Sequence, residues 1–180
     1  MLSFKSQTIQ KILSYYFINS HAKHYVNELA RLLELDPKNT HKKLTELEEE
    51  GILKSEFQGN QRYFFLSSSP LVKTYKQLLS QTFGLEMQLK KALSKVEGVK
   101  ESYIYGSYAK GLMSAGSDID LLVVGGQSAV VLQKAVNLIQ KNSGRELNIV
   151  NMSEKEFESK KNGKNPFIVN VLKGKTIKII

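Results

Sequence analysis

The 180-residue sequence predicts an α+β protein built from a helical N-terminal part, a long connecting helix and a C-terminal α/β part. Three observations predict this class. Apolar residues recur at helical spacing from residue 9 to about residue 50, and two β-rich runs follow. A heptad-like pattern spans residues 71–96. Beyond residue 98, strand and helix patterns alternate, which is typical of a small mixed sheet with helices. We therefore divide the chain into 1–68, 69–97 and 98–180.

The first part, residues 1–68, shows the order of three helices followed by a hairpin. Apolar positions 9, 12, 13, 16 and 17 mark the first helix, and a second covers about 24–35. Asp36-Pro37 supplies an N-cap and a proline at the first helical position, so the third helix begins there and runs to about residue 50. The runs 52–57 and 62–66 flank a Gly-Asn turn and form the hairpin. This order is typical of a winged helix-turn-helix, whose third helix enters the major groove of DNA.

The third helix and the hairpin carry the candidate DNA-binding residues. Cations bind phosphates, and amide and hydroxyl groups hydrogen-bond to bases or the backbone. The candidates are Lys38, Asn39, Thr40, Lys42, Lys43 and Arg62. Residues 1–68 carry nine cations against eight acids, a net charge of +1. Because non-specific affinity for DNA depends on cations at phosphates, a protein-binding role for this part stays open.

The connecting segment repeats residues in steps of four and three, at positions 71, 75, 78, 82, 85, 89, 92 and 96, and all of them are apolar except Thr82. Two interpretations remain open: a long helix that packs on its own domains, or a homodimer helix through 71–96. Gly84 lies in the middle of this seam. A glycine weakens a helix by about 1 kcal/mol relative to alanine, so Gly84 is able to divide the connecting helix into two.

Composition and charge exclude several classes of function. The chain has no cysteine, which excludes disulfides, thiolate metal sites and cysteine nucleophiles. Its apolar runs reach four residues, whereas a membrane-spanning helix needs about 20. The first residues also lack the apolar core of a signal peptide. We expect a cytoplasmic protein without a membrane partner. The net charge of +9, of which +5 falls in residues 98–180, favours phosphate-bearing partners.

The chemistry of the third part centres on Gly106-Ser107 and on the pair Asp118 and Asp120. Gly106 lets the backbone approach a ligand, and Ser107 opens a helical turn whose N–H groups suit phosphate. Asp118 and Asp120 are two residues apart at the start of an expected strand, so both side chains leave one face. Paired carboxylates favour Mg²⁺, which keeps phosphate oxygens in its shell. Carboxylates beside a phosphate site are the parts of in-line nucleotidyl transfer.

These residues resemble a known signature. Gly106-Ser107, Ala109-Lys110-Gly111 and Ser117-Asp118-Ile119-Asp120 are similar to the motif of the DNA polymerase beta-like nucleotidyltransferase superfamily, of the minimal type, over about 98–180. The winged helix in front resembles a fusion seen within that superfamily. The resemblance implies catalytic and Mg²⁺-binding roles for Asp118 and Asp120. It also implies a nucleoside triphosphate, with ATP expected, at Gly106, Ser107, Lys110 and Ser117.

The superfamily uses a third carboxylate on a later strand, and here Asn148 stands at that position. An asparagine offers a carbonyl oxygen to a metal but cannot accept a proton. Glu146 lies on the same face by strand alternation and is a candidate substitute. Three functions follow: a nucleotidyltransferase acting on an unidentified acceptor, a DNA-binding regulator whose degenerate domain only binds nucleotide, and a module that binds a small all-helical protein.

Overall fold

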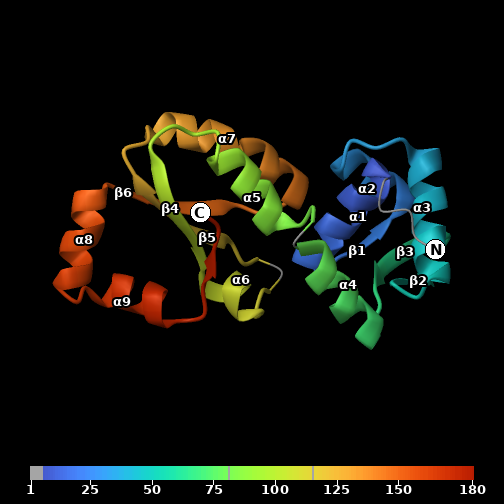
Figure 1. Cartoon of the computed structure of the whole chain (residues 1–180). Helices are drawn as coiled ribbons and strands as arrows, with labels where there is room; N and C mark the ends of the chain where they lie inside the picture. The colour runs from blue at the N-terminus through green and yellow to red at the C-terminus, as the bar shows by residue number, and fades with distance from the viewer. Residues whose placement is uncertain (1–5, 81, 115) are drawn as a thin grey trace. The chain divides into compact units, whose positions relative to one another are not determined.

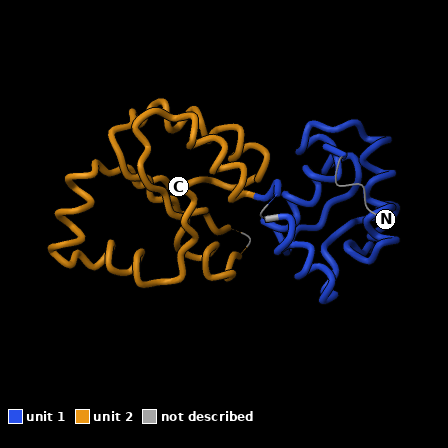
Figure 2. Tube along the Cα trace, in the orientation of Figure 1, with its two compact units in different colours: residues 1–84 blue, residues 85–180 orange. Residues whose placement is uncertain are grey.

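The computed structural model describes residues 6–80, 82–114 and 116–180 (Figure 1). The chain forms two compact units, residues 1–84 and residues 85–180 (Figure 2). In the described ranges, no helix is long and apolar enough to cross a membrane.

The N-terminal unit contains the predicted helices and hairpin. Its elements are α1 (Gln7–Ile18), β1 (Lys23–Tyr25), α2 (Val26–Leu32), α3 (Pro37–Glu49), β2 (Leu53–Gln58), β3 (Gln61–Leu66) and α4 (Pro70–Ser80). The Asp36 carboxylate caps α3 by accepting the N–H of Asn39 at 2.7 Å. The strands pair antiparallel in the order β1-β3-β2. Tyr16 lies in the core of this unit, where it is fully buried. Its hydroxyl donates a hydrogen bond to the carbonyl oxygen of Phe64 at 2.8 Å.

Two predictions about the first 97 residues need correction. The predicted second helix, 24–35, is shorter, because Lys23–Tyr25 pairs with β3 as a strand and places the ring of Tyr25 5.7 Å from that of Tyr63. The single connecting helix predicted over 69–97 is two helices, α4 and α5 (Leu85–Leu93), with Thr82 and Phe83 in a turn between them.

The heptad-like seam is divided between the two helices. Leu71 and Leu78 are exposed on α4, whereas Leu85 and Leu89 of α5 are buried in the C-terminal unit. A homodimer through 71–96 stays a prediction.

The C-terminal unit is a sheet covered by helices on both faces. After α5 come β4 (Val99–Tyr105), α6 (Gly106–Lys110), β5 (Ile119–Gly125), α7 (Ala129–Ser143), β6 (Leu147–Met152), α8 (Glu154–Asn162), α9 (Pro166–Lys173) and β7 (Ile177–Lys178). Over the described residues the strand order is β6-β5-β4-β7, with β5 and β6 parallel and the other pairs antiparallel. The sheet is therefore mixed, as the sequence predicts.

The two faces of this sheet are covered by different helices. Figure 1 shows α5 and α7 on one side and α8 and α9 on the other. Phe157 of α8 and Ile168 of α9 pack against Leu122 and other apolar residues of β5 and β6. Side chains alternate along a strand, so the side chain of Asp120 lies on the same face of the sheet as that of Leu122. Asp120 comes two residues before Leu122 and is not part of the apolar cluster. The polar start of β5 therefore lies on the face that α9 partly covers.

Candidate functional site

The close approach of Gly106 to Asp120 brings together the two halves of the predicted motif. Tyr105 pairs with Asp120 across β4 and β5, so the chain turns into α6 directly beside that carboxylate. Gly106 has φ +72°, in the left-handed region that favours glycine, and a Cβ atom placed on it would overlap the carboxylate of Asp120. The glycine is thus required twice, by its backbone conformation and by the space that the carboxylate fills.

Asn148 lies on the other side of the same carboxylate. The parallel register of β5 and β6 pairs Asp120 with Asn148, whose amide Nδ2 donates to Asp120 Oδ1 at 3.2 Å. Glu146, the candidate substitute for a third carboxylate, is exposed and precedes β6.

Asp118 is exposed and immediately precedes β5, with Ser117 in front of it. The hydroxyl oxygen of Ser117 accepts the backbone N–H of Ser114 at 2.9 Å. The carbonyl oxygen of Ser117 accepts a guanidinium N–H of buried Arg145 at 2.9 Å. These bonds hold Ser117 in front of the two aspartates, and the first of them already engages its hydroxyl oxygen.

A partly buried hydrogen bond anchors α6 to α5. The hydroxyl of Tyr108 donates to Glu86 Oε1 at 3.0 Å. Burial, followed by the nearby Glu86 carboxylate, raises the pKa of Tyr108, so the phenol stays protonated and remains a donor at neutral pH. The Ser107 hydroxyl, at the start of the same helix, lies 3.3 Å from Met113 Sδ.

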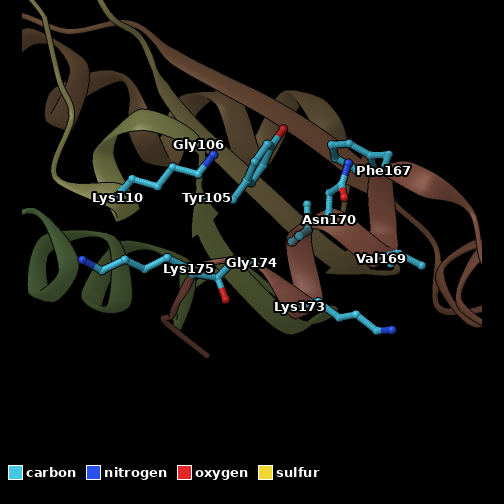
Figure 3. Close-up of a pocket in the computed structure, with 11 residues that line it drawn as sticks. Tyr105, Gly106, Lys110, Phe167, Val169, Asn170, Lys173, Gly174 and Lys175 are labelled. Atoms are coloured by element: carbon cyan, nitrogen blue, oxygen red, sulfur yellow. The ribbon is translucent and has the colours of Figure 1, made fainter.

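A cavity of about 580 Å³ opens beside Gly106, between α6, α9 and the segment before β7 (Figure 3). Figure 3 shows Lys110 and Lys175 at one end and Lys173 at the other. Tyr105 and Phe167 form an edge-to-face pair along its wall, with ring centroids 5.5 Å apart. Burial, followed by the charge of Asp120, raises the pKa of Tyr105, so this phenol is neutral at physiological pH. Of the cavity residues, sequence reasoning found Gly106 and Lys110 and missed those of α9 and Lys175.

The donor set at this edge fits a hard divalent cation. Asp118 and Asp120 offer carboxylate oxygens, and Asn148 offers an amide oxygen once its side chain turns by half a rotation from its bond to Asp120. Within the described residues, no group of three or more His, Cys, Asp or Glu side chains is placed to hold a metal. A metal here would therefore depend on these two carboxylates, on the Asn148 amide oxygen and on ligands supplied by the substrate.

The candidate DNA-binding residues of the N-terminal unit divide into three groups. Lys38, Asn39 and Lys42 are exposed on the first turns of α3. Thr40 is fully buried and its hydroxyl donates to the carbonyl oxygen of Asp36 at 2.8 Å, so its assignment to DNA is wrong.

The remaining two candidates are cations that already have acidic partners. Lys43 pairs with Glu46 at 2.7 Å, and Arg62 pairs with Glu48 at 2.5 Å while its Nε donates to Ser55. The predicted surface is therefore reduced to the start of α3, with Lys43 and Arg62 partly neutralised.

Solved structures give weak likenesses. HlyU from Vibrio cholerae N16961, in its reduced form, is 23% identical with a TM-score of 0.36, covering 44% of this chain and 79% of its own. A protein from Sulfolobus solfataricus assigned as a nucleotidyltransferase is 22% identical with a TM-score of 0.29, covering 41% and 68%. The archaeal chromatin protein TrmBL2 is 16% identical with a TM-score of 0.29, covering 92% and 72%. All three TM-scores lie below 0.5.

No curated protein matches this chain. A family model does match, and it is described as a nucleotidyltransferase domain. The match runs over residues 86–179, just over half of the chain, and includes Gly106, Asp118, Asp120 and Asn148. The chain therefore belongs to the nucleotidyltransferase domain family.

Proposed function

We propose that this chain binds a nucleoside triphosphate, with ATP the expected one, and transfers its nucleotidyl group to an acceptor hydroxyl. Asp118 and Asp120 hold Mg²⁺, while Gly106, Ser107 and Lys110 contact the phosphates. When bound, Mg²⁺ neutralises charge on the phosphates and orients them for in-line attack. The observation that carries this proposal is the packing of Gly106 on the Asp120 carboxylate.

The chain's own residues contribute position and charge. The Tyr108–Glu86 bond holds α6 in place, so the backbone after Gly106 is fixed relative to β5. Lys110 ends α6, is exposed and lines the cavity, where an ammonium group attracts phosphate oxygens. Positioning and charge neutralisation are the main contributions that phosphoryl chemistry needs from a protein.

The test is a calorimetric titration of ATP, with and without Mg²⁺, into wild type and Asp120→Asn. We expect Mg²⁺-dependent binding in wild type and a loss of more than about 100-fold in the variant, because a neutral amide replaces a ligating carboxylate. Glu97→Gln removes the same charge from an exposed turn before β4 and should bind like wild type. Equal binding by Asp120→Asn and wild type would show that the assigned metal site is wrong.

A second candidate function is regulation, and Asn148 favours it. Its amide cannot accept a proton from an attacking hydroxyl, which suits a domain that binds nucleotide without turnover. In this function the N-terminal unit is a winged helix-turn-helix that binds DNA through α3. The order of its elements and the exposed Lys38 and Lys42 support that assignment.

The DNA-binding proposal predicts that Lys38→Glu/Lys42→Glu weakens binding to duplex DNA by about tenfold or more at low salt, because two phosphate contacts become repulsive. Lys73→Glu/Lys90→Glu changes the net charge equally at exposed helix positions and should have little effect. The measurement is fluorescence anisotropy with a labelled genomic fragment upstream of the gene, with and without ATP. Wild type without affinity for this DNA at low salt would exclude the regulatory function.

A further inference from the structure

Arg145 is a buried cation at the point where α7 ends and β6 begins. It is 9% exposed, and Gly144 in front of it ends α7 with φ +64°. The hydroxyl of Ser143 contacts the backbone of Arg145 twice, because it accepts the N–H at 3.2 Å and donates to the carbonyl oxygen at 3.4 Å. The backbone of this residue is therefore held in place, and its long side chain extends from a fixed point.

The guanidinium of Arg145 binds the residue in front of Asp118. Its Nη1 donates to the carbonyl oxygen of Ser117 at 2.9 Å, between residues 28 positions apart in the sequence. That carbonyl and the N–H of Asp118 belong to one planar peptide group, so a bond that fixes the carbonyl also fixes the orientation of the N–H. Hydrogen bonds from charged donors are stronger than those between neutral groups. Arg145 therefore restrains the backbone where it enters Asp118.

Asp118 depends on such a restraint because it lies outside the regular elements. It is exposed, and the described residues between α6 and β5 belong to no helix or strand. One residue later, the N–H of Ile119 donates to the carbonyl oxygen of Glu146 at 2.9 Å. Asp118 is thus flanked by two hydrogen bonds, one on each side, and both are made by the consecutive residues Arg145 and Glu146.

A role in packing alone would not require a charge at residue 145. Burial of a guanidinium costs desolvation free energy, whereas an apolar side chain of similar length fills the same space without that cost. The guanidinium contributes a donor to the carbonyl that precedes one of the two aspartates. This contribution favours a role of Arg145 in the site over a role in packing.

We propose that Arg145 is a positioning residue of the nucleotidyl transfer site, which holds the peptide before Asp118 so that this carboxylate stays available, together with Asp120, to one cation. This inference rests on the proposed function. Residues that orient metal ligands commonly contribute about 10–100-fold to metal affinity. Because Arg145 acts through Asp118, its loss should weaken the metal site while the contacts of α6 with the phosphates remain.

The test measures the Mg²⁺ concentration that half-saturates binding of a fluorescent ATP analogue, at fixed analogue concentration, to the full chain. Arg145→Ala and Arg145→Met should each raise this midpoint by about 10–100-fold. Excess Mg²⁺ should then restore the wild-type stoichiometry of binding, which a misfolded chain cannot do. A methionine fills most of the space of the arginine stem, so Arg145→Met keeps the packing even if Arg145→Ala fails to fold.

Added guanidinium ion separates the hydrogen bond from the fold. At concentrations far below those that unfold proteins, it should enter the space vacated in Arg145→Ala and lower the Mg²⁺ midpoint towards the wild-type value. Sodium chloride at equal concentration should not do so. Arg145→Met fills that space and should not respond to guanidinium. Lys134→Met removes one positive charge from an exposed position of α7, and its midpoint should equal that of wild type.

Three outcomes would overturn the inference. Wild-type midpoints in both Arg145 variants would show that Asp118 needs no such restraint. A weakened Arg145→Ala that guanidinium does not restore would assign Arg145 to the fold alone. An equal shift in Lys134→Met would reduce the effect to net charge. A failure of the proposed function itself looks different, because wild type would then bind no ATP at any Mg²⁺ concentration.

Discussion

Replacing Gly106 with alanine is expected to reduce Mg²⁺-dependent ATP affinity by more than about 100-fold. Two effects act together. The backbone has φ +72°, where an L side chain is strained by about 1–2 kcal/mol, and the new methyl overlaps the Asp120 carboxylate. Either α6 or the carboxylate must then move, and both are parts of the proposed nucleotide site. Calorimetry of ATP with and without Mg²⁺ measures the loss.

Gly111 provides a matched control for this variant. It ends α6 with φ +74°, nearly the same as Gly106, but a Cβ atom placed on it meets nothing within 4 Å in the described part of the chain. Gly111→Ala should therefore lose similar stability, about 1–2 kcal/mol, and keep ATP affinity within about threefold. If the two alanine variants bind ATP equally, the contact between Gly106 and Asp120 does not serve nucleotide binding.

Local signals predicted those parts of the fold that depend on neighbouring residues. Asp36-Pro37 predicted the start of α3, and the Asp36 carboxylate does cap that helix. The alternating pattern beyond residue 98 predicted the strands on which Asp120 and Asn148 lie side by side. The resemblance to nucleotidyltransferases, carried by a few motif residues, is confirmed by the family match over residues 86–179.

Features that depend on tertiary contacts were not predictable in this way. Residues 23–25 form a strand because they pair with β3. The apolar residues around them recur at helical spacing, so the sequence pattern predicted a helix there instead. The seam from 71 to 96 keeps the same spacing of residues throughout. Its first leucines are nevertheless exposed on α4, whereas its later ones, on α5, are buried in the C-terminal unit. Residue type marked Thr40 and Arg62 as candidates, but burial of the first and the Glu48 pairing of the second depend on the folded chain.

The cavity beside Gly106 shows a further limit of sequence reasoning. Phe167, Asn170 and Lys173 reach it from α9, about 60 residues after the Gly-Ser motif. The one local signal was Asn165-Pro166, which starts that helix, and the Asn165 side chain indeed accepts the N–H of Phe167. That signal locates a helix end but carries no information on the face of the sheet that the helix covers.

The variant Asn148→Asp distinguishes the two proposed functions. It restores a third carboxylate where the amide now donates to Asp120 at 3.2 Å. A carboxylate there is able to ligate a cation and to accept the proton of an attacking hydroxyl, and general bases contribute about 10²–10⁴-fold to rates. If the chain is a transferase limited by Asn148, pyrophosphate release should rise by about 100-fold.

The expected rise in pyrophosphate release requires the new carboxylate to lie on the face of the sheet that carries Asp120. A second asparagine of β6, Asn151, serves as the control. Asn151 lies on β6 three residues later, so alternation places it on the opposite face, and its side-chain oxygen accepts the Gln127 amide, a role that a carboxylate keeps. Asn151→Asp should leave the release rate unchanged. If Asn148→Asp binds Mg–ATP more tightly but releases no more pyrophosphate than wild type, proton acceptance is not what the domain lacks, and the regulatory function is favoured.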